Sequence, residues 1–297
     1  MERLHELAAL ARRHMGDRPA EGVGPVLAPG LQLIVSSGLT AGQQLVYEPM
    51  LCLIVEGGKR STLGSETYDY RAGEYLVVSA ELPVSGQVIE APYLAIGIPL
   101  DPNLIAELML DMQVVHDPTP QRALAVCRME DEMVDAVLRL LRLLDRPEQA
   151  GVLAPLIQRE IVWRLLSGER GGAVRQIASG EGRVTQVNKV IRWIRSRYAE
   201  PLRVEELADM VGMSETSLFR HFRAVTAMSP LQYQKQIRLQ EARTLLLTQA
   251  HDVAGVGFAV GYNNPSQFSR EYSRLFGLPP GRDADRLRAD PALAVAV

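Results

Sequence analysis

The chain has 297 residues, with 32 Lys and Arg against 35 Asp and Glu, so its formal net charge is −3. This length suits about two domains, and the two cysteines, Cys52 and Cys127, fit neither a disulfide framework nor a zinc site. Nothing at the N-terminus resembles an export signal, and no apolar run reaches the roughly 18 residues that a membrane span needs. We therefore expect a cytoplasmic protein without membrane contact.

The charge is divided unevenly along the chain. Residues 180–297 carry 16 basic and 12 acidic side chains, a net charge of +4, which leaves 16 and 23, or −7, for residues 1–179. A basic part attached to an acidic part is the pattern expected of a nucleic-acid binder with a separate regulatory domain.

The first 100 residues favour a β domain behind a short helical arm. Residues 1–25 predict a helix around Leu4, Leu7 and Leu10, followed by a Gly- and Pro-rich tail that we expect to lie over the domain. Residues 30–100 alternate short apolar runs with turn signals, which indicates a sandwich or small barrel. The expected strands are Gln43–Glu48, Leu51–Glu56, Lys59–Leu63, Thr67–Tyr70, Tyr75–Ser79, Val84–Ile89 and Tyr93–Pro99.

A barrel of this kind could instead be an enzyme, and metal ligands decide between the two possibilities. Barrel enzymes of this kind hold a metal with clustered histidines, but none of the five histidines lies within residues 30–100. We therefore expect no metal, no cofactor and no catalysis. Cys52 lies in an apolar strand, which favours a buried small side chain over a sensing thiol. Residues that could line a pocket, but are equally consistent with strand surface or core, are Tyr47, Glu48, Lys59, Tyr75 and Tyr93.

Residues 101–179 predict helices whose apolar faces need a partner. Asp101-Pro102 and Thr119-Pro120 are both signals for a cap and a first helical turn. The helix after Thr119-Pro120 is expected to bury Leu124, Cys127, Val134, Val137, Leu138, Leu141 and Leu144, and a later one Leu153, Leu156, Ile157, Ile161, Val162 and Leu165. These faces either cover the barrel or pair with a second subunit in a homodimer. Five glycines between Gly168 and Gly182 predict a linker.

The last third of the chain contains two similar segments about fifty residues apart. Leu218-Phe219-Arg220-His221-Phe222 is matched by Phe268-Ser269-Arg270-Glu271-Tyr272, and a glycine-containing turn precedes each segment. Each copy reads as helix, turn, helix, which is the pattern of proteins that place the second helix in the DNA major groove. Two copies are a far more specific signal than one.

The residues of each copy support this interpretation. Gly212 can take the positive φ that ends a helix, Ser214 is a good N-cap, and Pro265 suits a first helical turn. The predicted buried stripes are Leu218, Phe222 and Val225 in the first copy and Phe268, Tyr272 and Leu275 in the second. The opposite faces carry hydroxyls and arginines, which reach phosphates and base edges. The predicted DNA-binding residues are Thr216, Ser217, Phe219, Arg220, Arg223, Ser266, Ser269 and Arg270.

The segment between the copies sets their spacing. Ser229-Pro230 predicts the start of a helix that runs to about Thr248 and is roughly 27 Å long. Such a helix can hold the two reading helices about one duplex turn apart, roughly 34 Å, so that one chain reads two successive major grooves.

Residues 184–288 resemble the C-terminal domain of AraC/XylS-type transcription regulators. The motif segments are Leu207-Ala208 through Phe222, Arg238-Leu239 with Ala242, and Gly261-Tyr262 through Phe276-Gly277 to Pro280. A glycine common after the first recognition helix is Ala227 here, and the usual aromatic-arginine ending is replaced by Gly281-Arg282-Asp283-Ala284. The resemblance implies sequence-specific DNA binding, with the second helix of each repeat as the reader.

Residues 30–100 resemble the N-terminal domain of a subset of AraC-type regulators, which implies a cupin-like barrel that senses a small molecule. The segments that carry this resemblance are Tyr47-Glu48-Pro49, Leu51-Cys52-Leu53 with Gly57, Gly73 with Tyr75-Leu76-Val77-Val78-Ser79, Leu82-Pro83-Val84 and Ala91-Pro92-Tyr93-Leu94.

Together these observations predict an α+β protein with a cupin-like sensor domain at 1–100, a helical dimerisation or linker region at 101–179 and a double helix-turn-helix domain at 180–297. Expected partners are double-stranded DNA, an unidentified small-molecule effector and a second copy of the chain, with RNA polymerase as a further candidate. Two alternatives remain open. One is a DNA-binding regulator whose β domain only dimerises, and the other is a cupin enzyme fused to a DNA-binding domain.

Overall fold

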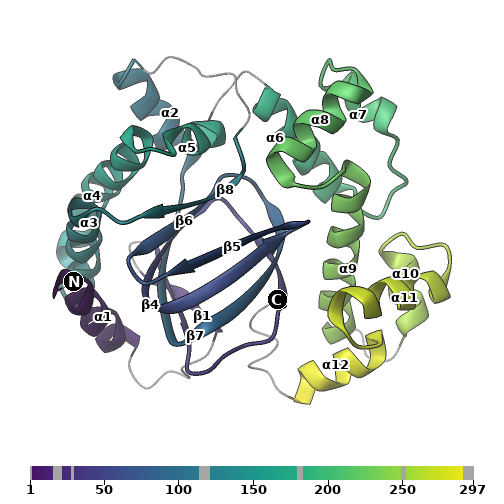
Figure 1. Ribbon diagram of the computed structural model, residues 1–297, viewed down its shortest axis with the longest axis horizontal. Helices are drawn as coiled ribbons and strands as arrows, with labels where there is room; N and C mark the ends of the chain where they lie inside the picture. Colours follow the sequence, from purple (N-terminus) through teal and green to yellow (C-terminus); the bar gives the residue numbers. More distant parts are fainter. Residues whose placement is uncertain are drawn as a thin grey trace.

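A computed structural model describes residues 2–15, 22–27, 30–113, 121–178, 183–248 and 252–289. Within these residues, strands and helices of the N-terminal half form one body, and the helices of the C-terminal third lie beside it (Figure 1). This organisation confirms the predicted α+β class.

One antiparallel sheet forms the N-terminal barrel. Its strands follow the order β1-β2-β7-β4-β6-β8, with β3 paired to β7 and β5 paired to β4. Leu53 of β4 lies opposite Ile96 of β7, and both are fully buried. The strands are β1 Gly22–Leu27, β2 Leu31–Ser36, β3 Gln43–Tyr47, β4 Met50–Leu63, β5 Glu66–Arg71, β6 Glu74–Val78, β7 Leu82–Pro99 and β8 Leu124–Arg128.

The longest strands, β4 and β7, differ from the prediction. The segments Leu51–Glu56 and Lys59–Leu63 form one strand, as do Val84–Ile89 and Tyr93–Pro99. Gly57 does not turn the chain; it takes a φ of 70° inside β4, where the pairing of β4 with β7 shifts between Ile54 and Lys59. A Cβ atom at Gly57 would lie 2.4 Å from the Glu90 carbonyl oxygen, so this bulge requires glycine.

The bulge decides which side chains of β4 face the barrel interior. Before it, Leu53 packs in the core beneath the N-terminal helices, whereas Ile54 packs in a second core on the opposite face. After the bulge the alternation of side chains is inverted. Leu63 lies in the second core, although it is an even number of positions from Leu53, which lies in the first core. Because side chains alternate along a strand, the shift turns Lys59 toward the same side as Leu63.

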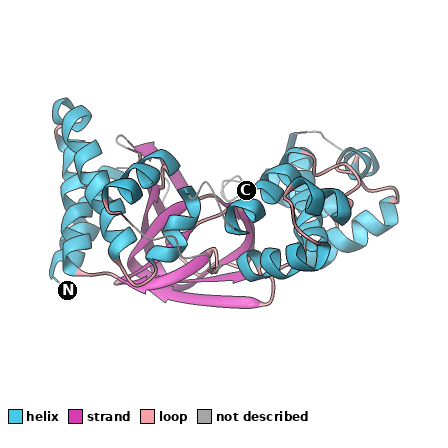
Figure 2. Cartoon of the chain, turned by 90° about the horizontal axis from the view of Figure 1, so that it is seen from above, coloured by secondary structure: helices cyan, strands magenta, loops and turns pink. Residues whose placement is uncertain are grey.

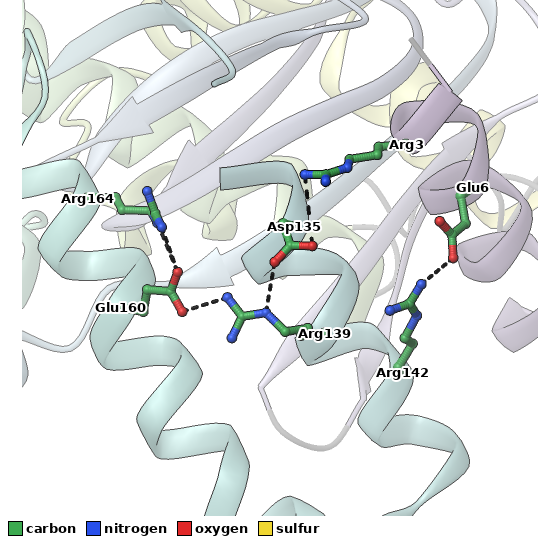
Figure 3. Close-up of polar contacts among 7 residues, drawn as sticks. All are labelled: Arg3, Glu6, Asp135, Arg139, Arg142, Glu160 and Arg164. Atoms are coloured by element: carbon green, nitrogen blue, oxygen red, sulfur yellow. Dashed lines mark hydrogen bonds and ion pairs between the residues drawn. The ribbon is translucent and has the colours of Figure 1, made fainter. Parts of the chain in front are cut away.

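Helices of the N-terminal half cover one face of the sheet, as Figure 2 shows from above. They are α1 Glu2–Met15, α2 Pro102–Asp111, α3 Asp131–Arg142, α4 Pro147–Ser167 and α5 Gly171–Ala178, with a short 3-10 turn, η1, at Leu143–Asp145. Ion pairs join α1, α3 and α4 above this core (Figure 3). Arg139 is central to them, lying 3.0 Å from Asp135 and 2.6 Å from Glu160.

Two expectations about residues 101–179 are wrong. Thr119-Pro120 lies outside the described residues, but Leu124–Arg128 is strand β8 on the edge strand β6, and the helix begins only at Asp131. The unpaired backbone edge of β6 provides hydrogen bonds that a helix at this place would leave unmade. Much of the expected linker is helix α5, whose Ala173 and Val174 are buried.

The C-terminal helices follow the predicted repeat. They are α6 Arg183–Ser196, α7 Val204–Met210, α8 Glu215–Thr226, α9 Pro230–Thr248, α10 Val253–Ala259, α11 Pro265–Phe276 and α12 Pro280–Ala289. The first helix-turn-helix is α7–α8 and the second is α10–α11. The long helix α9, with 19 residues and a length of about 28 Å, connects them.

The first helix-turn-helix shares its core with the barrel. One continuous apolar cluster includes Ile54 and Tyr93 of the barrel together with Val190, Phe222 and Tyr233 of the helical part. The second helix-turn-helix has a separate core around Phe268 and Tyr272. The two helix-turn-helix units therefore differ in their attachment to the barrel.

Candidate nucleic-acid interface

Helix α8 begins and ends as its sequence predicts. Gly212 has a φ of 63°, and the Ser214 hydroxyl accepts a hydrogen bond from the Ser217 N–H at 3.3 Å. The helix ends at Ala227 with a φ of 58°, a left-handed conformation that favours glycine. Ala227 thus keeps the backbone turn of the common family glycine at some cost in strain.

The two faces of α8 separate as expected. The stripe Leu218, Phe222 and Val225 is fully buried. Of the predicted DNA-binding residues, Thr216, Phe219, Arg220 and Arg223 are exposed and Ser217 is half-buried. Exposed arginine and threonine side chains beside an exposed aromatic ring form a surface that can meet phosphates, base edges and thymine methyl groups.

Helix α11 repeats this arrangement with a different cap. The Asn264 side-chain oxygen accepts hydrogen bonds from the N–H groups of Ser266 at 2.8 Å and Gln267 at 3.2 Å, and Pro265 takes the first helical position. The predicted stripe is buried at Phe268 and Tyr272 but only partly at Leu275. Ser266 and Arg270 are exposed and Ser269 is half-buried.

The spacing helix α9 is tied to both units by Arg238. Its guanidinium donates to the carbonyl oxygens of Tyr198 at 2.6 Å, Glu200 at 2.8 Å and Gly261 at 2.8 Å. One side chain therefore joins the chain before α7 to the turn of the second helix-turn-helix. Gly261 lies so close to Ala199 that a Cβ would stand 2.1 Å from its carbonyl oxygen. Arg238 belongs to the motif segment Arg238-Leu239 of the sequence, but this bracing role was not predicted for it; its position midway along α9 was the available signal.

Glu271 braces α11 against α9. Its carboxylate accepts hydrogen bonds from Lys235 at 3.0 Å, Gln267 at 3.1 Å and Tyr262 at 2.9 Å. Burial acts to raise its pKa, but the hydrogen bonds from these three donors and the charge of Lys235 outweigh it and hold the pKa of Glu271 below its usual value. These contacts fix the rotation of α11 on α9.

A buried ion pair attaches α12. Asp283, whose side chain is 2% exposed, lies 2.9 Å from the Arg243 guanidinium of α9 and accepts a hydrogen bond from the Tyr272 hydroxyl at 2.9 Å. Asp283 belongs to the segment Gly281-Arg282-Asp283-Ala284 that departs from the usual family ending, and its role was not predictable from that segment. Its three-way contact joins α9, α11 and α12.

The barrel contacts the first unit through polar groups as well as the shared core. Arg122, just before β8, donates to the carbonyl oxygens of Arg223 at 2.7 Å and Ala224 at 2.8 Å and pairs with Glu66. The Tyr233 hydroxyl of α9 donates to the Glu81 carbonyl oxygen at 2.8 Å.

The five residues considered for a pocket do not all meet. Tyr47, Lys59 and Tyr93 lie together, with the Lys59 ammonium 5.4 Å from the Tyr47 ring centre and 5.9 Å from that of Tyr93. Glu48 is exposed, and Tyr75 lies on the other face of the sheet.

Cys52 is buried, as expected, and burial above all raises the pKa of its thiol. Across the described ranges, no cluster of three or more His, Cys, Asp or Glu side chains could hold a metal ion. None of the described helices is both long and apolar enough to cross a bilayer.

Comparison with family models gives two matches that together cover both halves of the chain. The model described as AraC-type transcriptional regulator N-terminus matches residues 27–173, and the one described as helix-turn-helix domain matches residues 207–286. The chain belongs to the AraC family of transcription regulators. The family assignment agrees with the resemblance seen in the sequence.

The individual proteins that the chain matches have low sequence identity to it, 26% and 28% in two cases. The chain is 28% identical over 163 residues to the transcriptional activator RhaS of Escherichia fergusonii, covering 53% of this chain and 58% of RhaS. It is 26% identical over 156 residues to the regulator ArgR of Pseudomonas aeruginosa, covering 52% of this chain and 46% of ArgR. The chain thus spans about half the length of the curated relatives it matches.

A solved structure shows the same fold over most of the molecule. ToxT from Vibrio cholerae, in complex with (E)-4-(8-methylnaphthalen-1-yl)but-3-enoic acid, superposes with a TM-score of 0.56 at 9% identity. The match covers 87% of this chain and 99% of that one.

Proposed function

We propose that this AraC-family protein is a transcription regulator that binds double-stranded DNA with α8 and α11. The observation that carries the proposal is that two capped helices expose hydroxyls and arginines while Arg238 fixes the long helix between them. A chain that reads two successive grooves gains specificity from the fixed distance between its readers. The protein would act on chromosomal DNA in the cytoplasm and would have no catalytic activity of its own.

Each predicted contact has a chemical role in this proposal. Arg220 and Arg270 would pair with guanine O6 and N7, and Phe219 would pack on a thymine methyl group. The hydroxyls of Thr216, Ser217, Ser266 and Ser269, with the guanidinium of Arg223, would bind phosphates or base edges.

The proposed homodimer would form through α4. Leu156 of α4 is 61% exposed, and exposed Val152, Leu153 and Trp163 lie on the same helix. An open groove of about 1070 Å³ between α1, α3 and α4 includes Leu10, Leu153 and Leu156 in its walls. Burial of apolar side chains of this size would stabilise a pair of subunits. RhaS is named an activator, and on that ground RNA polymerase is a further proposed partner.

The proposed effector is a small organic molecule bound in the N-terminal domain. ToxT, which shares this fold, has been solved with an apolar carboxylic acid. The barrel here touches the first reading helix directly through Arg122, so a ligand that alters the barrel can alter DNA affinity.

Selection of bound DNA from a random pool tests the main proposal. We expect the full-length chain to enrich a site with two conserved blocks about one helical turn apart. Analytical ultracentrifugation of the wild type and of Leu156→Glu tests the dimer, with Asp131→Ala as an exposed control. Absence of any enriched sequence would contradict DNA reading, and a monomeric wild type would contradict the dimer.

A further inference from the structure

A cavity of about 300 Å³ lies between the barrel and the second reading unit. The barrel contributes Lys59 and Tyr93, and the helical part contributes Phe276, Arg286 and Leu287. This size is at the small end of the range for small-molecule sites, which run from roughly 300 to 1,000 Å³. The cavity is built by two domains, so its shape depends on how they pack.

Lys59 is a half-buried cation in the wall of this cavity, and none of the described carboxylates pairs with it. The bulge in β4 turns it inward, between the rings of Tyr47 and Tyr93 at 5.4 and 5.9 Å. None of the carboxylates in the described parts of the chain forms an ion pair with it, although the structure pairs most nearby arginines. The side chain is half-buried, so an anionic ligand in the cavity would gain from the charge of an ammonium group that none of the described carboxylates neutralises.

Tyr93 adds a second donor to the same cavity, a hydroxyl that has only a weak contact with the Cys52 thiol. The residue is 2% exposed, and its hydroxyl has no hydrogen-bond partner among the described residues. Buried hydroxyls are normally paired, and an orphan of this kind calls for an explanation. Burial above all, together with Cys52, Tyr47 and the weak contact with the Cys52 thiol, holds the pKa of Tyr93 well above its usual value, so the hydroxyl keeps its proton and can donate to a better acceptor.

Neighbouring hydroxyls make the place between Lys59 and Tyr93 more favourable to an anion. The Tyr70 and Ser61 oxygens are 2.7 Å apart, and the Ser61 and Tyr47 oxygens are 3.2 Å apart. Tyr70 can donate to Ser61 and Ser61 to Tyr47, so that the Tyr47 oxygen accepts from Ser61 and from the Lys59 ammonium while its own proton can be donated to a ligand oxygen. Asp283, the acidic residue among those that line the cavity, does not compete with a ligand anion for Lys59, because Arg243 and Tyr272 already bind its carboxylate.

The rest of the wall is largely apolar. It includes Ile34, Leu39, Leu45 and Val88 from the barrel and Phe276 and Leu287 from the helices. A ligand that satisfies both parts carries one anionic group and a compact apolar body. Arg286 at the α12 side adds positive charge, which also favours an anion.

We propose that this cavity is the effector site and that the effector is a compact organic carboxylate, with its oxygens on Lys59 and Tyr93 and its apolar body against Phe276 and Leu287. The inference rests on the proposed regulatory function. Because both domains form the wall, a bound acid ties the barrel to α11 and α12 and thereby changes the position of the second reading unit.

The test uses the full-length protein and three acids, octanoate, decanoate and 4-phenylbutanoate, each paired with its primary amide. Isothermal calorimetry should show at least one acid binding tenfold or more tightly than its amide. Lys59→Met should weaken that acid at least tenfold and Tyr93→Phe to a smaller extent. Arg60→Met, the next residue on β4, is exposed and paired with Asp69, so it should leave acid binding unchanged.

A second readout separates a ligand anchor from a structural lysine. Ligand-free Lys59→Met should melt close to the wild-type temperature, because the half-buried ammonium makes no ion pair among the described residues, whereas loss of a structural contact would lower the melting temperature. Equal binding of acid and amide, no binding of any acid, or full acid binding by Lys59→Met would each overturn the site. DNA binding is measured separately on the selected sequence. Acid binding without any effect on DNA binding would contradict the regulatory function but not the acid site, whereas DNA binding without acid binding would contradict the acid site alone.

Discussion

The Arg122 guanidinium donates a hydrogen bond of 2.7 Å to the backbone carbonyl oxygen of Arg223 in the last turn of α8. A residue of the barrel thereby supplies a positive charge to the C-terminal end of α8, where the helix dipole favours cations. The barrel and the first helix-turn-helix are linked through this contact.

Replacement of Arg122 should therefore weaken the attachment of α8. Arg122→Ala removes donors to two terminal carbonyl oxygens and should lower the free energy of unfolding by about 1–2 kcal/mol. Urea unfolding measures the change. Arg128→Ala, also exposed and close in sequence, should change stability by less than about 0.5 kcal/mol. Equal stabilities of the two variants would show that the contact carries no free energy.

Base preference should depend on Arg220 and Arg270. Each substitution by Ala should cost roughly 1–3 kcal/mol of binding free energy and relax preference in one half of the site, if the guanidinium pairs with guanine. If Arg270 meets phosphate instead, Arg270→Ala should weaken all sequences evenly. Quantitative gel shifts on the selected site and on single-base variants provide the measurement. Arg282→Ala on α12 is a charge-matched control, and a double variant with full affinity and full specificity is incompatible with the assignment.

The Asp283 contact should be important for the second reading unit. Asp283→Ala leaves Arg243, 13% exposed, and the Tyr272 hydroxyl without their partner, and should cost about 3–5 kcal/mol of stability. Asp285→Ala, two residues away with a side chain 70% exposed, should cost less than about 0.5 kcal/mol. Thermal unfolding of both variants tests the difference, and similar melting temperatures would refute a stabilising role for the buried pair.

Acid should loosen α11 through Glu271. Its pKa is lower in the folded state than its usual 4.5, so its stabilising contribution is complete above about pH 4.5 and is lost as the pH falls through the folded value. Glu271→Gln should therefore lose less stability than the wild type between pH 6 and pH 3. Chemical unfolding across this range, with exposed Glu48→Gln as the control, gives the comparison. Parallel curves for wild type and Glu271→Gln would exclude this carboxylate as a source of acid sensitivity.

The sequence by itself determined the local features of the helical part. Ser214, Pro265 and the buried stripes around Phe222 and Phe268 lie where the repeat placed them, because capping and helix periodicity depend on residues within a few positions of one another. Local patterns of the same kind predicted most of the strands. The absence of histidines from residues 30–100 can be read directly from the sequence.

The tertiary structure alone decided the long-range arrangement. Leu124–Arg128 became a strand because β6 offered an open edge, and Gly57 became a bulge because β7 passes too close for a side chain. That bulge reverses the direction of Lys59 and brings it to Tyr93, 34 residues later in the sequence. Contacts of this kind depend on strand register and on packing between domains, which no short segment of sequence can specify.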